Sequence, residues 1–197
     1  WNVDFPHLML RGKAARYKRG EATLRDKVLS NTDALGHFAG IPIVTQAVNA
    51  VNRTPPARHA LEATLGVDRD AWLPEFAPRK FRRTAKPSDG LPVRDGERTP
   101  GKVAIYATCY VNFNEPGIGH DLLAILAHND IPYELVAREA CCGMPLPEQG
   151  NLAGVAAQKD VNLPVLERHA REGSALTGAI PSCVLSYKRH LPLRVPR

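Results

Sequence analysis

The chain has 197 residues, of which 44% are hydrophobic and 23% charged, with 26 Lys and Arg against 20 Asp and Glu. This composition excludes a chain that is disordered throughout, and the length is enough to bury one sizeable core or two small ones. The most apolar window, residues 38–51, is interrupted by Pro42, Gln46 and Asn49, so the sequence predicts no membrane-spanning helix. No signal peptide is recognisable at the start, and because the chain opens on Trp1 we expect a piece of a longer protein.

The net charge of +6 is unevenly distributed. Residues 78–102 carry eight Lys and Arg against three Asp and Glu, whereas residues 103–187 carry four against nine. Basic charge gathered in a connection and at the chain ends is typical of solvated segments. The basic run 79–83 could contact a phosphate backbone, but we favour a solvated linker, or a contact with an acidic partner or an anionic membrane surface. We therefore predict no specific nucleic-acid binding.

The first part of the chain, residues 1–77, is predicted to form a small all-helical region. Residues 7–29 are mostly helix formers, and Ser30 and Asn31 can cap a following helix. Pro55 and Pro56 start a further helix that Gly66 ends. Nothing in this region suggests chemistry. Residues 78–102, rich in Pro, Gly and charge, are predicted to be a linker.

The second part, residues 103–197, alternates between strand and helix patterns. Short β-prone runs are expected at 103–107, 131–136 and 175–180, with helices at 121–128 and 151–171 between them. This order predicts an α/β module with a parallel sheet, in which ligands gather at the carboxyl ends of the strands. The turn 114–119 could bind phosphate, but it has only two glycines and no following Lys-Ser or Lys-Thr, so a tight turn before a helix is favoured. His120 and His128 are interpreted as ordinary helix-face histidines.

All four cysteines lie in this second part, each at or just after the end of a predicted strand. Cys109 follows the first strand, the adjacent Cys141 and Cys142 the second, and Cys183 the third. Adjacent cysteines bond each other poorly, and nothing points to secretion, so two disulfides are not favoured. Thiols gathered from three loops suit zinc or an iron–sulfur cluster. Buried structural thiols and a redox dithiol stay open as alternatives.

Several motifs together resemble a known cysteine-rich family. They are Cys109-Tyr110, Cys141-Cys142-Gly143-Met144-Pro145, Gln149-Gly150-Asn151-Leu152 and Pro181-Ser182-Cys183. In this order they are similar to the CCG domain of iron–sulfur proteins related to the B subunit of heterodisulfide reductase and to the C subunit of anaerobic glycerol-3-phosphate dehydrogenase. The resemblance covers residues 103–193, and more weakly residues 1–8.

The resemblance implies a cofactor and a set of ligands. Cys109, Cys141, Cys142 and Cys183 would hold an iron–sulfur cluster, of the 4Fe–4S type, or alternatively zinc. Gly143 would allow a close backbone turn, with its amide directed at a cluster sulfide. Residues 103–197 would be the first of a pair of such modules, after a ferredoxin domain. The chain departs from the family pattern because Ser186 stands where a last cysteine is expected, so five-thiolate ligation is in question.

The resemblance also implies a role and partners. The chain would relay electrons from a flavoprotein dehydrogenase of a small hydroxy compound, such as glycerol 3-phosphate, lactate or glycolate, or from a heterodisulfide-type partner. The acceptor would be a membrane quinone or another carrier. We expect a hetero-oligomer in the cytoplasm or on the inner face of the cytoplasmic membrane. The alternative is a zinc-bound or metal-free module that docks partner subunits without redox activity.

Overall fold

The computed structural model describes residues 4–88, 91 and 101–190. At its centre is a parallel sheet of three short strands in the order β2-β1-β3. The strands are β1 (Val103–Ile105), β2 (Tyr133–Leu135) and β3 (Ala175–Thr177). Val103 is in register with Tyr133 on one side and with Ala175 on the other. The predicted α/β fold with a parallel sheet is confirmed.

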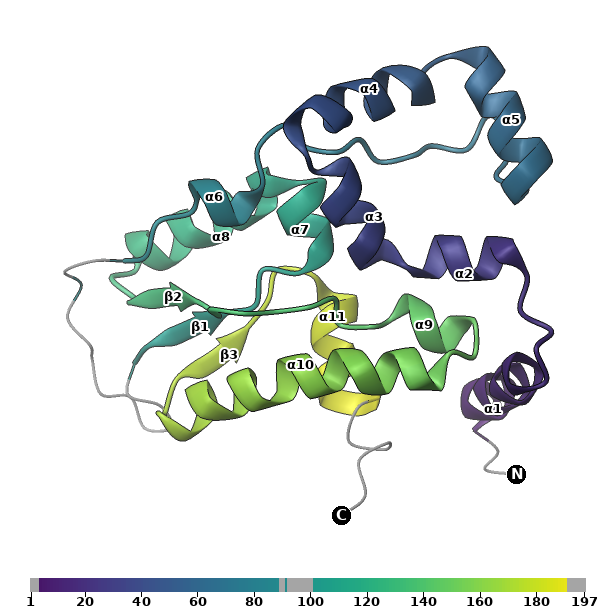
Figure 1. Cartoon of the computed structure of the whole chain (residues 1–197). Helices are drawn as coiled ribbons and strands as arrows, with labels where there is room; N and C mark the ends of the chain where they lie inside the picture. Colours follow the sequence, from purple (N-terminus) through teal and green to yellow (C-terminus); the bar gives the residue numbers. More distant parts are fainter. Residues whose placement is uncertain (1–3, 89–90, 92–100, 191–197) are drawn as a thin grey trace.

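Helices cover both faces of the sheet (Figure 1). On one face lie α6 (Phe81–Thr84), α7 (Cys109–Phe113) and α8 (Pro116–His128); on the other lie α10 (Leu152–Arg171) and α11 (Pro181–Leu185). The short helix α9 (Pro145–Glu148) precedes α10, and a π-helical turn (Ser186–His190) follows α11. Alternate residues of a strand point to opposite faces, so Ala104 and Tyr106 enter one core and Ile105 and Ala107 the other.

The N-terminal region is helical, as the sequence predicts, and its described residues form five helices. They are α1 (Phe5–Lys18), α2 (Leu24–Ser30), α3 (Thr32–Ala39), α4 (Pro42–Asn52) and α5 (Pro55–Leu65). The expected helix over 7–29 is broken, because Gly20 takes a left-handed conformation and Thr23 starts a new helix through a capping box with Asp26. Asn31 caps α3, as expected. Helices α1 and α2 contact α9, and α3 contacts α7, so this region packs directly on the α/β module.

The first residues of the predicted linker, 78–102, are folded in the structure. Phe81, at the start of α6, is fully buried in the core beside α8. Arg82 donates from its guanidinium to the carbonyl oxygens of Val136 (2.7 Å) and Ala137 (3.0 Å) just after β2. These residues of the basic run are therefore part of the fold and not a solvated connection. Most of the remaining linker, residues 89–90 and 92–100, lies outside the described residues, as do residues 1–3 and 191–197.

Within the described part of the chain, no single helix has the length and apolar character needed to cross a membrane. Helices α3 and α4 reach that length and composition only as a pair, and a bend of 108° separates them.

Candidate metal centre

The four cysteines meet at the carboxyl edge of the sheet. Cys109 is the first residue of α7 after β1, Cys141 and Cys142 lie in the loop between β2 and α9, and Cys183 lies in α11 after β3. Three of them are at most 5% exposed, and Cys109 is half-buried. The structure thus brings together all four thiols that the sequence singled out.

The sulfur atoms lie in a row from Cys109 through Cys141 and Cys142 to Cys183. Sγ of Cys109 lies 3.7 Å from Sγ of Cys141, and Sγ of Cys142 lies 3.1 Å from Sγ of Cys183. All four are free thiols. The peptide bond between Cys141 and Cys142 joins the two pairs, so residues from three separate loops form one sulfur-lined site.

Each pair contains one thiol that is readily ionised and one that is not. Donation from the Cys109 thiol lowers the pKa of Cys141, and donation from the Cys142 thiol lowers the pKa of Cys183. The donating partners, Cys109 and Cys142, have raised pKa values. For both, the first cause is a hydrogen bond to Cys141 that ionisation would break; for Cys142 the bond to Cys183 adds to it, and burial disfavours charge in both. Thiolate is the form that ligates metals, so the site holds ligands that are already predisposed to bind.

Gly143 closes the turn after the adjacent cysteines. Its φ of +78° lies in the left-handed region, which glycine enters without the penalty that a Cβ imposes. In this conformation its amide donates to Sγ of Cys141 at 3.4 Å. The resemblance implied that this amide points at a cluster sulfide. In the structure it points at the sulfur of Cys141. Hydrogen bonds to such sulfurs raise the reduction potential of a bound cluster.

The N-terminal region contributes to the site, contrary to the expectation that it carries no chemistry. Thr32, the first residue of α3, places its hydroxyl 3.4 Å from Sγ of Cys141. The next residue, Asp33, is half-buried, and both burial and the neighbouring Cys141 thiolate raise the pKa of its carboxyl. No local motif marks these two residues, because they reach the thiols only through the packing of α3 on α7.

The loop that carries Cys141 is also held from α10 and from the residues just after β1. Asn162 of α10, 1% exposed, hydrogen-bonds the backbone of Ala140 and Cys141. The Tyr106 hydroxyl donates to the carbonyl oxygen of Ala140. Glu139 accepts from the amide of Ala107 at 2.9 Å. Sequence reasoning missed these residues; the one available signal is a polar Asn on the apolar side of a predicted helix.

The turn over 114–119 and His120 serve packing. A Cβ added at Gly119 would lie 2.5 Å from the ring of Phe81, so this glycine gives the buried ring its space. The Nε2 atom of His120 lies 2.9 Å from the hydroxyl oxygen of Thr84, and its ring contacts Phe81 edge-on. These contacts agree with the interpretation of a tight turn and an ordinary helix-face histidine.

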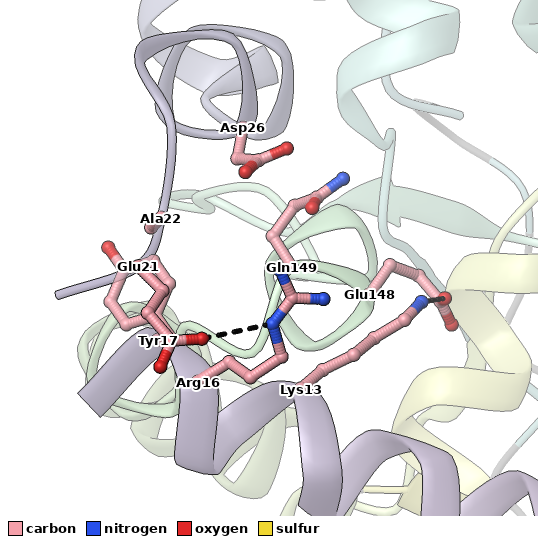
Figure 2. Close-up of a pocket in the computed structure, with 8 residues that line it drawn as sticks. All are labelled: Lys13, Arg16, Tyr17, Glu21, Ala22, Asp26, Glu148 and Gln149. Atoms are coloured by element: carbon pink, nitrogen blue, oxygen red, sulfur yellow. Dashed lines mark hydrogen bonds and ion pairs between the residues drawn. The ribbon is translucent and has the colours of Figure 1, made fainter. Parts of the chain in front are cut away.

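A polar pocket of about 320 Å³ lies away from the sulfur atoms, where α1 and α2 meet α9 (Figure 2). Its lining combines both signs of charge and includes none of the cysteines. Lys13 donates to Glu148 at 3.2 Å and Arg16 to Glu21 at 3.2 Å, so the charges in Figure 2 largely neutralise one another. This pocket joins the N-terminal region to the module, and we assign it no ligand.

The spacing of the sulfur atoms bears on which metal group they suit. A single tetrahedral zinc ion with Zn–S bonds of about 2.3 Å requires all its sulfurs to lie about 3.8 Å apart. Among the described residues, no three of the four sulfurs lie within 4.8 Å of one another. The four sulfurs therefore form a row and not the compact tetrahedron that a single zinc ion needs. The donor set, three buried thiols and the half-buried Cys109, is one that iron–sulfur clusters and structural zinc sites both use.

Comparisons with known proteins support the resemblance in part. The chain is similar to the C subunit of anaerobic glycerol-3-phosphate dehydrogenase from Escherichia coli K12 and from Escherichia coli O157:H7. In both cases 32% of residues are identical over 138 residues, which are 69% of this chain and 33% of the relative. The chain therefore spans about a third of the length of these curated relatives. No family model matches it, and neither does any solved structure.

Proposed function

We propose that this chain is the cluster-bearing part of an electron-transfer subunit in an oxidoreductase complex. The observation that carries the proposal is the meeting of Cys109, Cys141, Cys142 and Cys183, from three loops, at one edge of a parallel sheet. The similarity to a subunit of an anaerobic dehydrogenase supports the same role.

The residues present would hold the cluster and set its surroundings. A bound 4Fe–4S cluster would supply a one-electron carrier. The four thiolates would ligate its irons, and the Gly143 amide and the Thr32 hydroxyl would hydrogen-bond the Cys141 sulfur. Apolar side chains, among them Val136 and Leu166, pack around three of the cysteines and keep water out. We place no substrate chemistry on this chain.

We further propose the partners from the name of the relatives. The donor would be a flavoprotein dehydrogenase subunit that oxidises a small hydroxy compound, of which glycerol 3-phosphate is the first candidate. The acceptor would be a quinone or another membrane-linked carrier, and the chain would work within a hetero-oligomer. Four free thiols suit a reducing compartment, so we place the chain in the cytoplasm, either free or against the inner face of the membrane.

Metal and sulfide analysis after anaerobic purification tests this proposal. We expect iron and acid-labile sulfide in equal amounts, about four of each per chain for a cubane cluster. The alternative, a structural zinc module, requires stoichiometric zinc without sulfide. That result, or a purified folded chain that takes up neither iron nor sulfide on reconstitution, would refute the cluster.

Variants of the thiols locate the cluster. We expect Cys142→Ser and Cys183→Ser to lose most of the bound iron, because each removes one thiolate ligand. Val184→Ala is the matched control: its side chain is 41% exposed, next to Cys183, and it should retain iron. Full iron retention in Cys142→Ser would exclude that residue as a ligand.

A further inference from the structure

A second group of metal-ligating side chains lies on the other side of the module from the thiols. Glu134 projects from β2, and His169 and Glu172 lie at the end of α10. One ligand atom from each lies within 4.8 Å of the other two. Nδ1 of His169 is 3.0 Å from Oε1 of Glu134 and 3.9 Å from Oε2 of Glu172.

His169 is the feature that points to a ligand. It is only 4% exposed, and neither ring nitrogen makes a hydrogen bond with the described residues. Burial of an unpaired polar group is costly, so a buried imidazole is normally satisfied. Although Nδ1 faces Glu134 closely, the two atoms lack the alignment of a hydrogen bond. A metal ion bound to Nδ1 would satisfy the nitrogen and draw the two carboxylates toward it.

The neighbouring cations leave the carboxylate atoms that face His169 available. Lys102 binds the other oxygen of Glu134, Oε2, at 2.7 Å, and Oε1 remains toward the imidazole. Arg168 lies 3.9 Å from Oε1 of Glu172, whose Oε2 faces His169. Both cations therefore reduce the negative charge of the group without occupying its centre.

The group is separate from the thiol site. Lys102 immediately precedes β1, so its ion pair with Glu134 marks the amino-terminal edge of the sheet. Along α10, His169 lies about 10 Å of helix rise beyond Asn162, the residue that holds the Cys141 loop. Figure 1 shows this end of α10 beside the start of β3. Ligand chemistry in such sheets gathers at the opposite edge, so a metal here would have a structural role.

We propose that Glu134, His169 and Glu172 form a site for a divalent transition metal, with Zn²⁺ as the expected ion, that ties β2 to the end of α10. One imidazole and two carboxylates suit zinc, whose bonds to nitrogen and oxygen of about 2.1 Å place tetrahedral donors about 3.4 Å apart. The separations from Nδ1 to the two carboxylate oxygens, 3.0 and 3.9 Å, lie on either side of that value. Water would fill the fourth position.

The test compares zinc bound by variants of the full chain, dialysed against the same buffered free Zn²⁺. We expect Glu172→Gln and His169→Gln to bind one zinc ion fewer per chain than the parent, regardless of how much zinc the four thiols bind. Glu167→Gln is the matched control, because Glu167 and Glu172 are similarly exposed (51% and 56%) and each is paired with an arginine of α10. It should bind as much zinc as the parent.

Cobalt substitution identifies the ligands by spectroscopy. The spectrum of the Co²⁺-loaded parent minus that of Glu172→Gln should show visible cobalt bands without the near-ultraviolet charge-transfer band that thiolate ligation gives. Equal zinc in the parent and Glu172→Gln overturns the proposal, as does an equal loss in Glu167→Gln or a thiolate band in the difference spectrum. Because Glu172 is exposed, its variant remains informative if His169→Gln fails to fold.

Discussion

Asn162 fixes the backbone of Cys141 through its carboxamide, which donates to the Cys141 carbonyl oxygen at 3.1 Å. The same side chain accepts from the amide of Ala140 at 2.7 Å and donates to the carbonyl oxygen of Ala140 at 3.2 Å. These bonds replace sheet pairing, which has already ended in this loop. The position of two of the four thiols therefore depends on one buried side chain of α10.

Replacement of Asn162 by Asp tests that dependence. The carboxylate keeps the shape but cannot donate, so the buried carbonyl oxygen of Cys141 loses its donor and that of Ala140 keeps only the Tyr106 hydroxyl. We expect the free energy of unfolding to fall by about 2–3 kcal/mol, as measured by urea denaturation, and iron retention to fall with it. Val161→Ala, on the neighbouring 41% exposed position, should change little. An unchanged unfolding free energy in Asn162→Asp would contradict the proposed support of the loop.

Gly150 sets how closely α1 approaches the module. Its φ is +83°, and an added Cβ would lie 2.3 Å from the carbonyl oxygen of Lys13 in α1. We expect Gly150→Ala to cost at least about 1 kcal/mol and to loosen α1, seen as faster hydrogen exchange of its amides. Gly12→Ala, at an open position of α1, should instead stabilise by about 0.5–1 kcal/mol. Equal exchange in the parent and Gly150→Ala would show that the contact is not needed.

The meeting of the four thiols could be predicted because it follows from chain order. Each of Cys109, Cys141 and Cys183 follows a strand within a few residues, and parallel strands end at the same edge of a sheet. Hydrophobic runs and the positions of Gly and Pro were likewise enough to predict the strands and most of the helices. These features are local in sequence, so they need no knowledge of tertiary packing.

The rest depends on tertiary packing that no local pattern encodes. Thr32 reaches Cys141 because α3 packs on α7, where Gly36 leaves room for the ring of Phe113. Phe81 lies among prolines and charges that predict a linker, yet the space left by Gly119 lets it enter the core. In both cases a glycine far away in sequence leaves the space that a phenylalanine ring fills: Gly36 for Phe113 and Gly119 for Phe81.

Ser186 stands where the resemblance to the CCG domain leads us to expect a last cysteine, one helical turn after Cys183. Both side chains are buried, at 6% and 5% exposure, so exposure does not distinguish them. Because four thiolates are enough for a cluster, we expect Ser186→Ala to keep the full iron content and Cys183→Ala to lose most of it. Iron and sulfide analysis of the two variants checks this. A loss of iron from Ser186→Ala equal to that from Cys183→Ala would show that the serine is a required ligand.

Glu139 should make stability depend on pH. Burial raises the pKa of its carboxyl from 4.5 to about 7, despite the nearby Arg82 guanidinium. The folded chain then keeps a proton that the unfolded chain releases, so the free energy of unfolding falls as pH rises between those values, by a few kcal/mol at most. Glu139→Gln stays neutral and lacks this slope. Urea denaturation of both metal-free proteins from about pH 5 to about pH 8 should show the parent losing stability relative to the variant; a relative gain would contradict the raised pKa.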